Sequence, residues 1–175
     1  MHEYNVKTTQ LRDACKYLRA GDRVLLSGVV YTARDAAHKR IFELLSSGEE
    51  LPFDIKDSSI YYAGPTPTPP EHSIGSSGPT TSSRMDRFAP KLYDLGMVAS
   101  IGKGDRSKDV YDAIIKNNAV YLCAIGGAGA LAAKCIKNCD VIAFDDLGCE
   151  SIKRLEFDEF PLTVAIDSLG NSLFV

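Results

Sequence analysis

The sequence predicts a single α/β domain with a mixed sheet, spanning residues 1–175. Its 175 residues are enough for one ordinary domain, and 45% of them are apolar, so a packed core can form. In the middle of the chain, apolar runs of strand length alternate with segments of helical period, a pattern typical of strands joined by helices. Both ends are richer in strand-like patterns. A mixed sheet therefore fits better than a doubly wound sheet of parallel strands alone.

The first half begins with an amphipathic segment, LRDACKYLRAGD, and then alternates strand and helix patterns. In RDAAHKRIFELLSSG the apolar residues lie on one helical face, and Gly48 is placed to end the helix. The predicted elements of this half are an amphipathic segment at 11–22, a strand at 23–32, a helix at 34–48 and a strand at 58–64.

A long irregular segment follows, from Gly64 to about Gly78. Its density of Pro, Gly, Ser and Thr excludes regular structure, and a loop of this length in a compact domain is usually functional or disordered. We favour a functional loop, because it leads directly into a predicted helix start that carries Arg84. Pro90 interrupts any single helix beyond this point and is expected to open the next helical turn.

The second half alternates more clearly and ends in a predicted hairpin. The predicted elements are a strand at 97–101, a helix at 107–118, a strand at 119–125, a helix at 131–138, a strand at 140–144, and strands at 162–167 and 172–175 around a turn at 168–171. The segment Glu150–Phe157 has no pattern that predicts either a helix or a strand.

Charge and the N-terminal residues argue against several classes of protein. Twenty basic and 23 acidic residues give a net charge of −3, whereas nucleic-acid binders usually show a basic excess. No apolar run approaches the roughly 20 residues of a transmembrane helix, and MHEYNVKTTQ lacks the basic and apolar regions of a secretory signal. We therefore expect a cytoplasmic protein that binds neither nucleic acid nor a membrane.

The five cysteines favour neither disulfides nor a metal site. An odd number, without a secretory signal, argues against a disulfide framework. Cys135 and Cys139 form a CxxxC pair, but no CxxC pair or nearby His completes a tetrahedral zinc site. Cys135 lies in the predicted apolar helix, where a free cysteine usually acts as a small core residue. No metal ligand is predicted in this chain.

The first candidate site lies at the start of the helix predicted over 34–48. Thr32 and Asp35 fit a capping box. Arg34 then lies in the first turn, where unpaired backbone N–H groups favour an anion, and its guanidinium can hold a carboxylate through two bonds. His38 follows at i+4, on the same face. A solvated Arg34–Asp35 pair and an ordinary helix-face histidine form the alternative interpretation.

The second candidate site is the segment GPTTSSRMD, residues 78–86. Four consecutive hydroxyl residues, Thr80–Ser83, follow a Gly-Pro turn, and Arg84 lies at the predicted helix start. Ser83 and Asp86 again fit a capping box. Such runs commonly cap helices and fill loops, but hydroxyls and a cation that meet after an irregular loop favour an anion site.

Two glycine-bearing turns offer further positions for a ligand. Lys103 lies between two glycines directly after a predicted strand, where open α/β sheets bind ligands, although the spacing of a nucleotide P-loop is missing. The run Gly127–Ala132 matches GxGxxA, with Asp145 and Asp146 near the distance of a ribose-binding acid. This match indicates a dinucleotide site, but a tight strand-to-helix turn explains the glycines equally well.

Six motifs, taken in order, resemble one family. SGVVYTARDAAHKR, YYAGP, GPTTSSRMD, IGKG, the Gly-rich turn and FPLTVAIDSLGN follow one another. In order and spacing they resemble the β-subunit, or C-terminal domain, of class I iron–sulfur fumarate hydratases and the related L-tartrate dehydratases. The similarity covers the chain from about Thr8 to Phe174, and the shared order is more specific than any single motif. The resemblance implies a mixed-sheet, swivelling β/β/α-type single domain.

The resemblance also implies roles for individual residues. Arg34, Arg84 and Lys103 match the family's binders of substrate carboxylates, and Lys103 is also expected to take part in catalysis. Thr80 matches the residue proposed there as the base that removes the C3 proton of malate, and the adjacent Thr81 is expected to bind substrate. Because a neutral threonine hydroxyl is a poor base, Thr80 needs activation by neighbouring cations or by the substrate's own environment.

A two-part enzyme is implied as well. In the family, three cysteines of the α-subunit or N-terminal domain hold a 4Fe–4S cluster whose open iron acts as a Lewis acid. We therefore expect a cluster-bearing α-subunit, an active site between the two chains, no activity in this chain alone, and a dimer of αβ pairs. The expected reaction is the reversible hydration of the dicarboxylate fumarate to L-malate. A dehydratase of tartrate or a related 2-hydroxy dicarboxylate, and a stand-alone dinucleotide-binding module, are the alternatives. No role is implied for His38.

Overall fold

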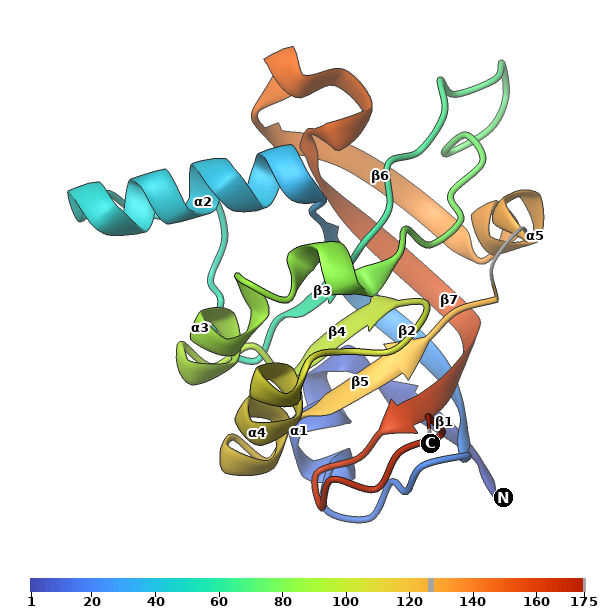
Figure 1. Cartoon of the computed structure of the whole chain (residues 1–175). Helices are drawn as coiled ribbons and strands as arrows, with labels where there is room; N and C mark the ends of the chain where they lie inside the picture. The colour runs from blue at the N-terminus through green and yellow to red at the C-terminus, as the bar shows by residue number, and fades with distance from the viewer. Residues whose placement is uncertain (126–127, 175) are drawn as a thin grey trace.

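Within residues 1–125 and 128–174, which the computed structural model describes, the chain forms a seven-stranded mixed sheet with helices against it (Figure 1), and this confirms the predicted α/β class. The strands are β1 (Glu3–Lys7), β2 (Arg23–Thr32), β3 (Ser59–Tyr61), β4 (Ala99–Gly102), β5 (Val120–Cys123), β6 (Ile136–Ala143) and β7 (Ile152–Ile166). The helices are α1 (Leu11–Ala14), α2 (Asp35–Ser47), α3 (Ala89–Asp94), α4 (Lys108–Lys116) and α5 (Gly129–Lys134), with 3-10 turns η1 (Thr8–Gln10), η2 (Ser82–Met85) and η3 (Asp145–Glu150). No described helix has both the length and the apolar character that crossing a bilayer requires.

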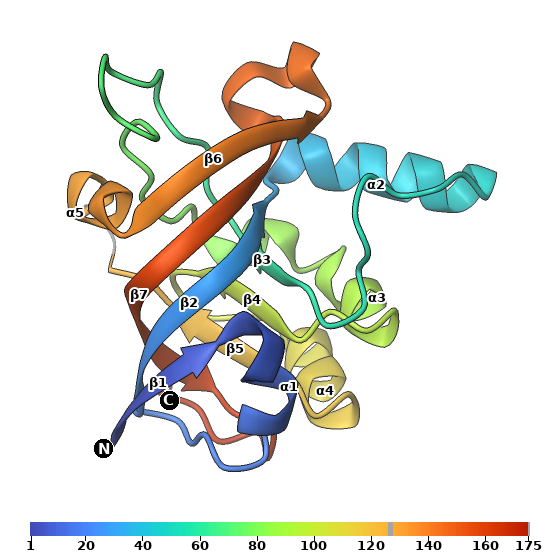
Figure 2. The ribbon, with the colours of Figure 1, turned by 180° about the vertical axis from the view of Figure 1, so that it is seen from behind.

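The strand order closes the sheet on itself. β2, β3, β4 and β5 are parallel to one another, while β7 is antiparallel to both β2 and β5. These five strands therefore form a barrel-like ring, with β1 beside β2 and β6 beside β7 (Figure 2). Because β2 to β5 are parallel, their last residues, Thr32, Tyr61, Gly102 and Cys123, lie at one edge of the sheet. We call this the carboxyl edge, where α/β sheets commonly bind ligands.

Two clusters of buried apolar side chains hold these layers together. The first joins α1 to the strands and includes Leu11 and Leu26. The second joins α2, α3 and α4 to the opposite side of the strands and includes Ile41, Leu92 and Ile114. Each such fully buried side chain stabilises the fold by roughly 1.5–3 kcal/mol. α2 and α3 pack against this same cluster, and because α2 begins at Asp35, shortly after β2 ends at Thr32, its start lies at the carboxyl edge.

Several predicted elements are confirmed. β2 has the predicted bounds, and α2 ends at Ser47 with Gly48 as its C-cap, whose φ of 71° is the left-handed conformation that glycine adopts readily. Pro90 lies in the first turn of α3, where the missing N–H does no harm. Residues 64–78 contain neither a helix nor a strand, as their composition predicts.

β7 differs most from the sequence prediction, because its first half lies in the segment Glu150–Phe157 for which no element was predicted. The strand's period of two is broken in the middle, since Glu159 has a φ of 50° and Pro161 lacks a backbone N–H. β7 nevertheless pairs with β2 on both sides of this break. The predicted strand 172–175 is wrong for the described residues, because Ser172 forms only an isolated bridge with Ile166.

Other elements also differ from the sequence prediction. The segment 11–22 forms only the short helix α1, and β1, for which no strand was predicted, pairs in parallel with β2. The predicted helix 131–138 ends at Lys134 because Ile136 begins β6, whose pairing with β7 extends the predicted strand 140–144 backwards. Here tertiary pairing outweighs the local helical pattern.

The fold contradicts the dinucleotide-binding alternative. A dinucleotide fingerprint belongs to a β-α-β unit with parallel strands. After β5 and α5, however, β6 runs antiparallel beside β7 and does not pair with β5, so the described residues form no such unit here. Gly127, the first glycine of the match, lies outside the described residues. Asp146, one of the two candidate ribose-binding acids, forms an ion pair with Arg40.

Candidate functional site

The carboxyl edge brings the predicted site residues to neighbouring positions. Arg34 follows β2 after one intervening residue, and Lys103 directly follows β4. The segment that carries Thr80 and Thr81 returns from the long loop to the end of β3, where the Thr80 N–H donates to the Tyr62 carbonyl at 2.6 Å. Thr81 and Lys103 form an isolated parallel bridge. Residues separated by up to 69 positions in sequence therefore share one edge of the sheet.

Arg34 lies at the N-cap of α2 in an extended conformation, and its side chain is 22% exposed. Its guanidinium packs against Gly64, where a Cβ atom would lie 2.8 Å from Arg34 Nη1. Arg34 Nε lies 4.0 Å from a carboxylate oxygen of Glu150, and it is buried without a hydrogen-bond acceptor among the described residues. A buried donor without an acceptor is unfavourable, so a ligand oxygen at this position would be bound favourably.

The capping box predicted from Thr32 and Asp35 is wrong. Thr32 is the last residue of β2 and is fully buried, so it cannot cap α2. Its hydroxyl accepts the N–H of Lys153 at 3.0 Å and donates to the Ser151 carbonyl at 3.3 Å. The threonine thus joins β2 to the start of β7 beneath the site, and Asp35 is left available for another partner.

That partner is Arg84. Arg84 Nη2 lies 2.8 Å from Asp35 Oδ2, and its Nε donates to Asp35 Oδ1 at 3.1 Å. The Arg84 side chain is 50% exposed, so this pair is solvent-accessible and easily rearranged. Since Asp35 directly follows Arg34 in the chain, the pair brings the two candidate arginines to the same end of α2.

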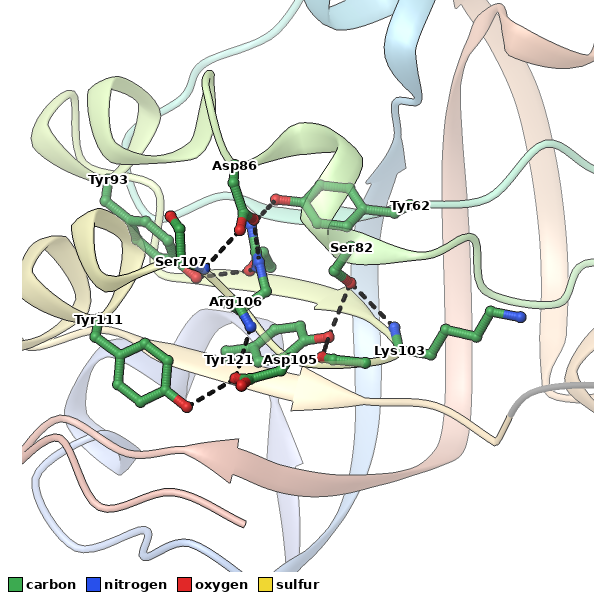
Figure 3. A network of polar contacts seen from close by, with 12 residues as sticks. Tyr62, Ser82, Asp86, Tyr93, Lys103, Asp105, Arg106, Ser107, Tyr111 and Tyr121 are labelled. Atoms are coloured by element: carbon green, nitrogen blue, oxygen red, sulfur yellow. Dashed lines mark hydrogen bonds and ion pairs between the residues drawn. The ribbon is translucent and has the colours of Figure 1, made fainter. Parts of the chain in front are cut away.

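The second predicted capping box, Ser83 with Asp86, is also wrong. Thr81 is the N-cap of η2, and no side chain among the described residues caps it. Asp86 instead accepts a hydrogen bond from Arg106 Nε at 2.7 Å (Figure 3), an ion pair that sequence reasoning missed.

The backbone of Lys103 is firmly held, while its side chain is not. The Lys103 N–H donates to Ser82 Oγ at 3.0 Å, and the Lys103 carbonyl accepts the Ser82 N–H at 2.9 Å. Figure 3 shows the lysine side chain extending away from this network. Its ammonium forms no hydrogen bond or ion pair with any described residue. It is therefore available to an anion.

His38 lies behind Arg34 and not in the open site. Its ring is fully buried, stacks on Phe88 and meets Tyr62 edge-on. Desolvation lowers the pKa of His38 to about 4, so the imidazole is neutral near pH 7. A neutral ring donates from Nδ1 to the Arg34 carbonyl 2.8 Å away, which leaves Nε2 without a partner among the described residues. His38 thus supports the backbone at Arg34.

The cysteines of this chain do not fit an iron–sulfur cluster. Among the described residues, no group of three or more His, Cys, Asp or Glu side chains could hold a metal ion. Cys135 follows α5, instead of lying within the predicted helix, and Cys139 lies in β6; both are half-buried and pack against the first core cluster. Burial raises the pKa of both thiols, which disfavours the thiolate form that a metal requires.

The carboxyl edge of this α/β domain thus combines two arginines, a lysine without a partner among the described residues, and a hydroxyl-rich turn, which are groups that can bind a small anion. Comparison with known protein families identifies the family to which this domain belongs. The family model described as Fumarase C-terminus matches residues 1–175. The chain belongs to this family.

Curated relatives agree with the family match. Fumarate hydratase 2 of Leishmania major is 40% identical over 94% of this chain, and the anaerobic class I fumarate hydratase of Escherichia coli is 42% identical over 87%. The match spans only 29% and 28% of the length of those two proteins. A protein of Methanocaldococcus jannaschii, provisionally named L(+)-tartrate dehydratase subunit beta, is 42% identical over 98% of this chain and 91% of its own length.

Proposed function

We propose that this chain is the β part of a two-part iron–sulfur hydro-lyase that hydrates fumarate reversibly to L-malate. The observation that carries the proposal is the convergence of Arg34, Arg84, Lys103 and Thr80 on one edge of the sheet, in a member of the fumarase family. Both acids are dianions, and guanidinium groups bind carboxylates through paired hydrogen bonds.

In this proposal the two arginines bind the two carboxylates of the substrate, and the lysine stabilises the charge that develops during the reaction. Arg34, with its unpaired buried Nε, holds one carboxylate, and Arg84 holds the other after exchanging part of its contact with Asp35. Removal of the proton next to a carboxylate builds further negative charge, which the Lys103 ammonium stabilises once water is excluded. Because no described carboxylate neutralises that ammonium, its full charge is available to the substrate.

Thr80 and Thr81 are proposed as the polar groups nearest the reacting carbon. The Thr80 backbone is held at the edge by the bond from its N–H to the Tyr62 carbonyl. A threonine hydroxyl accepts a proton only if it loses its own, and cations nearby favour that loss. Thr81 is exposed and is proposed to donate a hydrogen bond to the substrate.

The partner is proposed to be an α-subunit that holds the 4Fe–4S cluster. The described cysteines of this chain do not fit such a cluster, and the relative from Methanocaldococcus jannaschii is named as a subunit. A dimer of αβ pairs, with contact between two copies of this chain, and a cytoplasmic location belong to the same proposal.

The test is anaerobic reconstitution of this chain with a cluster-bearing α-subunit of the family, followed by a fumarate-to-malate assay on each component and on the mixture. Only the mixture should be active, and iron and acid-labile sulfide should be found with the α-subunit. Arg34→Ala and Arg84→Ala should each lower kcat/KM by at least 100-fold. This is on the order of the 2–5 kcal/mol that truncation of one partner of a buried charge pair costs. Arg23→Ala is the matched control, since Arg23 lies at the opposite end of β2. Normal turnover in both site variants would contradict the proposal.

Tartrate dehydration is the second candidate, because the tartrate-named relative matches this chain over nearly its whole length. The same mixture assayed on L-tartrate and fumarate separates the two. If tartrate alone is turned over, the binding roles stand and the substrate assignment changes.

A further inference from the structure

A buried ion pair behind the carboxyl edge has no part in the proposed chemistry. Arg106 lies three residues after Lys103, and its side chain is fully buried. Its Nε donates to Asp86 Oδ1 at 2.7 Å, and the Asp86 side chain is only 13% exposed. Burial of such a pair is unfavourable unless its remaining hydrogen-bonding groups are also satisfied, so it is weak evidence for added stability. Another reason for its presence is therefore needed.

The other groups around Arg106 fix its guanidinium in one orientation. Nη1 donates to Ser100 Oγ at 2.9 Å, and Nη2 donates to Tyr62 Oη at 3.3 Å. The guanidinium carbon lies 4.7 Å from the ring centroid of Tyr121 and 5.3 Å from that of Tyr62. Figure 3 shows the side chains of Tyr62, Arg106 and Tyr121 meeting between β4, β5 and η2. A lysine could keep the charge here but not this planar set of bonds.

Asp86 connects two segments that carry proposed substrate-binding residues. It directly follows η2, which contains Arg84. Its Oδ1 accepts from Arg106, and its Oδ2 accepts the N–H of Ser107 at 2.6 Å. Arg106 and Ser107 end the loop 103–107, which begins with Lys103. Asp86 thus holds η2 against the end of this loop, beside Arg106 and Ser107.

A second set of bonds joins the same two segments closer to the site. Tyr121 Oη lies 2.8 Å from both the Gly104 carbonyl and Ser82 Oγ. Because the carbonyl can only accept, Tyr121 donates to Gly104, and the Ser82 hydroxyl then donates to Tyr121 while accepting the Lys103 N–H. The Arg106 guanidinium lies over the face of the Tyr121 ring, so this contact connects the two sets of hydrogen bonds.

We propose that Arg106 is a positioning residue for dicarboxylate binding. With Asp86 it fixes η2 relative to the loop 103–107, so that Arg84 and Lys103 meet one substrate at a fixed separation. The inference rests on the proposed function and assigns Arg106 no contact with substrate. The Lys103 ammonium has no described partner of its own, so the backbone held by this network determines where it can reach.

Arg106→Lys tests the positioning independently of activity. Hydrogen exchange of the full chain should be at least tenfold faster at the amides of Ser82 and Lys103, with exchange in β2 and β7 unchanged. Arg12→Lys is the matched control, because Arg12 also makes three hydrogen bonds, to Asp57, Gly96 and Asn117, at a distance from the site. If Arg106→Lys does not fold, Tyr121→Phe, which removes the bond to Gly104, replaces it in the same test. Unchanged exchange at both amides, or uniformly faster exchange throughout the molecule, would overturn the inference.

A double-mutant cycle in the active complex supplies the functional readout. Arg106→Lys should lower kcat/KM for the dicarboxylate at least tenfold, and by less than threefold when Lys103→Ala is already present, because a positioning residue has no effect on a missing side chain. Equal effects in both backgrounds would overturn the inference. A wild-type complex inactive on both fumarate and tartrate would refute the proposed function, whereas an active wild type matched by Arg106→Lys would refute this inference alone.

Discussion

Acidification should destabilise the fold through His38 well before any carboxyl group responds. The ring is fully buried, stacks on Phe88, and has its pKa lowered from 6.5 to about 4, mainly by desolvation, with a smaller effect of the nearby Arg106 cation. A protonated His38 is therefore tolerated in the unfolded chain but not in the folded one. Its contribution to stability is fully present above the unfolded pKa of 6.5, and it is lost progressively as pH falls from 6.5 towards 4.

The magnitude follows from the shift. One pKa unit corresponds to about 1.4 kcal/mol, so a change from 6.5 to about 4 means that full protonation of His38 lowers the free energy of unfolding by about 3 kcal/mol. About 2 kcal/mol of this is lost by pH 5. The carboxyl groups of Asp22, Asp94 and Asp146 have lowered pKa values, so their contributions disappear only below about pH 4. Between pH 6.5 and pH 4, the change in unfolding free energy is therefore expected to come from His38 and not from these three carboxyl groups.

The assay is urea unfolding of the chain at pH 7, 6 and 5, with His38→Gln as the matched variant. Gln retains an amide donor for the Arg34 carbonyl but does not titrate. The wild type should lose about 2 kcal/mol more than the variant between pH 7 and pH 5. Parallel pH profiles for the two proteins would show that His38 is accessible to protons in the folded state, and would refute the reasoning from burial.

Three further outcomes are expected. Gly102→Ala should reduce dicarboxylate turnover at least tenfold while the affinity for the α-subunit stays at the wild-type value, because the new Cβ would overlap Ser82 Oγ, which holds the Lys103 N–H. Equal turnover of variant and wild type in the reconstitution assay would contradict this. Gly28→Ala should lower the free energy of unfolding by about 1–3 kcal/mol, measured by urea denaturation, since its φ of 120° is strained for any side chain. Cys149 should react with a thiol reagent within minutes while Cys15, buried and with its pKa raised to about 12, reacts only on unfolding, as mass spectrometry of labelled peptides would record.

Local patterns predicted the positions of the candidate site residues better than their partners. Arg34 and Lys103 could be placed because each follows a strand, and the end of a strand is visible in a short window of sequence. Thr32 and Asp35 looked like a capping box for the same local reason. Their actual partners, Lys153 and Arg84, lie far away in sequence, and only the closed sheet brings them near.

The same limit explains the missed ion pair and the missed half of a strand. Asp86 and Arg106 are 20 residues apart, on either side of α3 and β4, and no short spacing marks them as partners. β7 is interrupted at Glu159 and Pro161, so its alternation is readable only in the second half. In both cases the decisive information is pairing across the ring, which a window of ten residues does not contain.

The place of β7 in the ring has a consequence for how the molecule is made. Its partners β2 and β5 lie up to about 140 residues earlier in the chain, as in the pair Arg23 and Thr163, so the ring closes only through contacts of long range. Until residues 152–166 leave the ribosome, the free sides of β2 and β5 are exposed as open edges on which a second nascent chain could pair. Folding should therefore be slow for a domain of this size, and yields in the cell should depend on the chaperones that shield those two strands during synthesis.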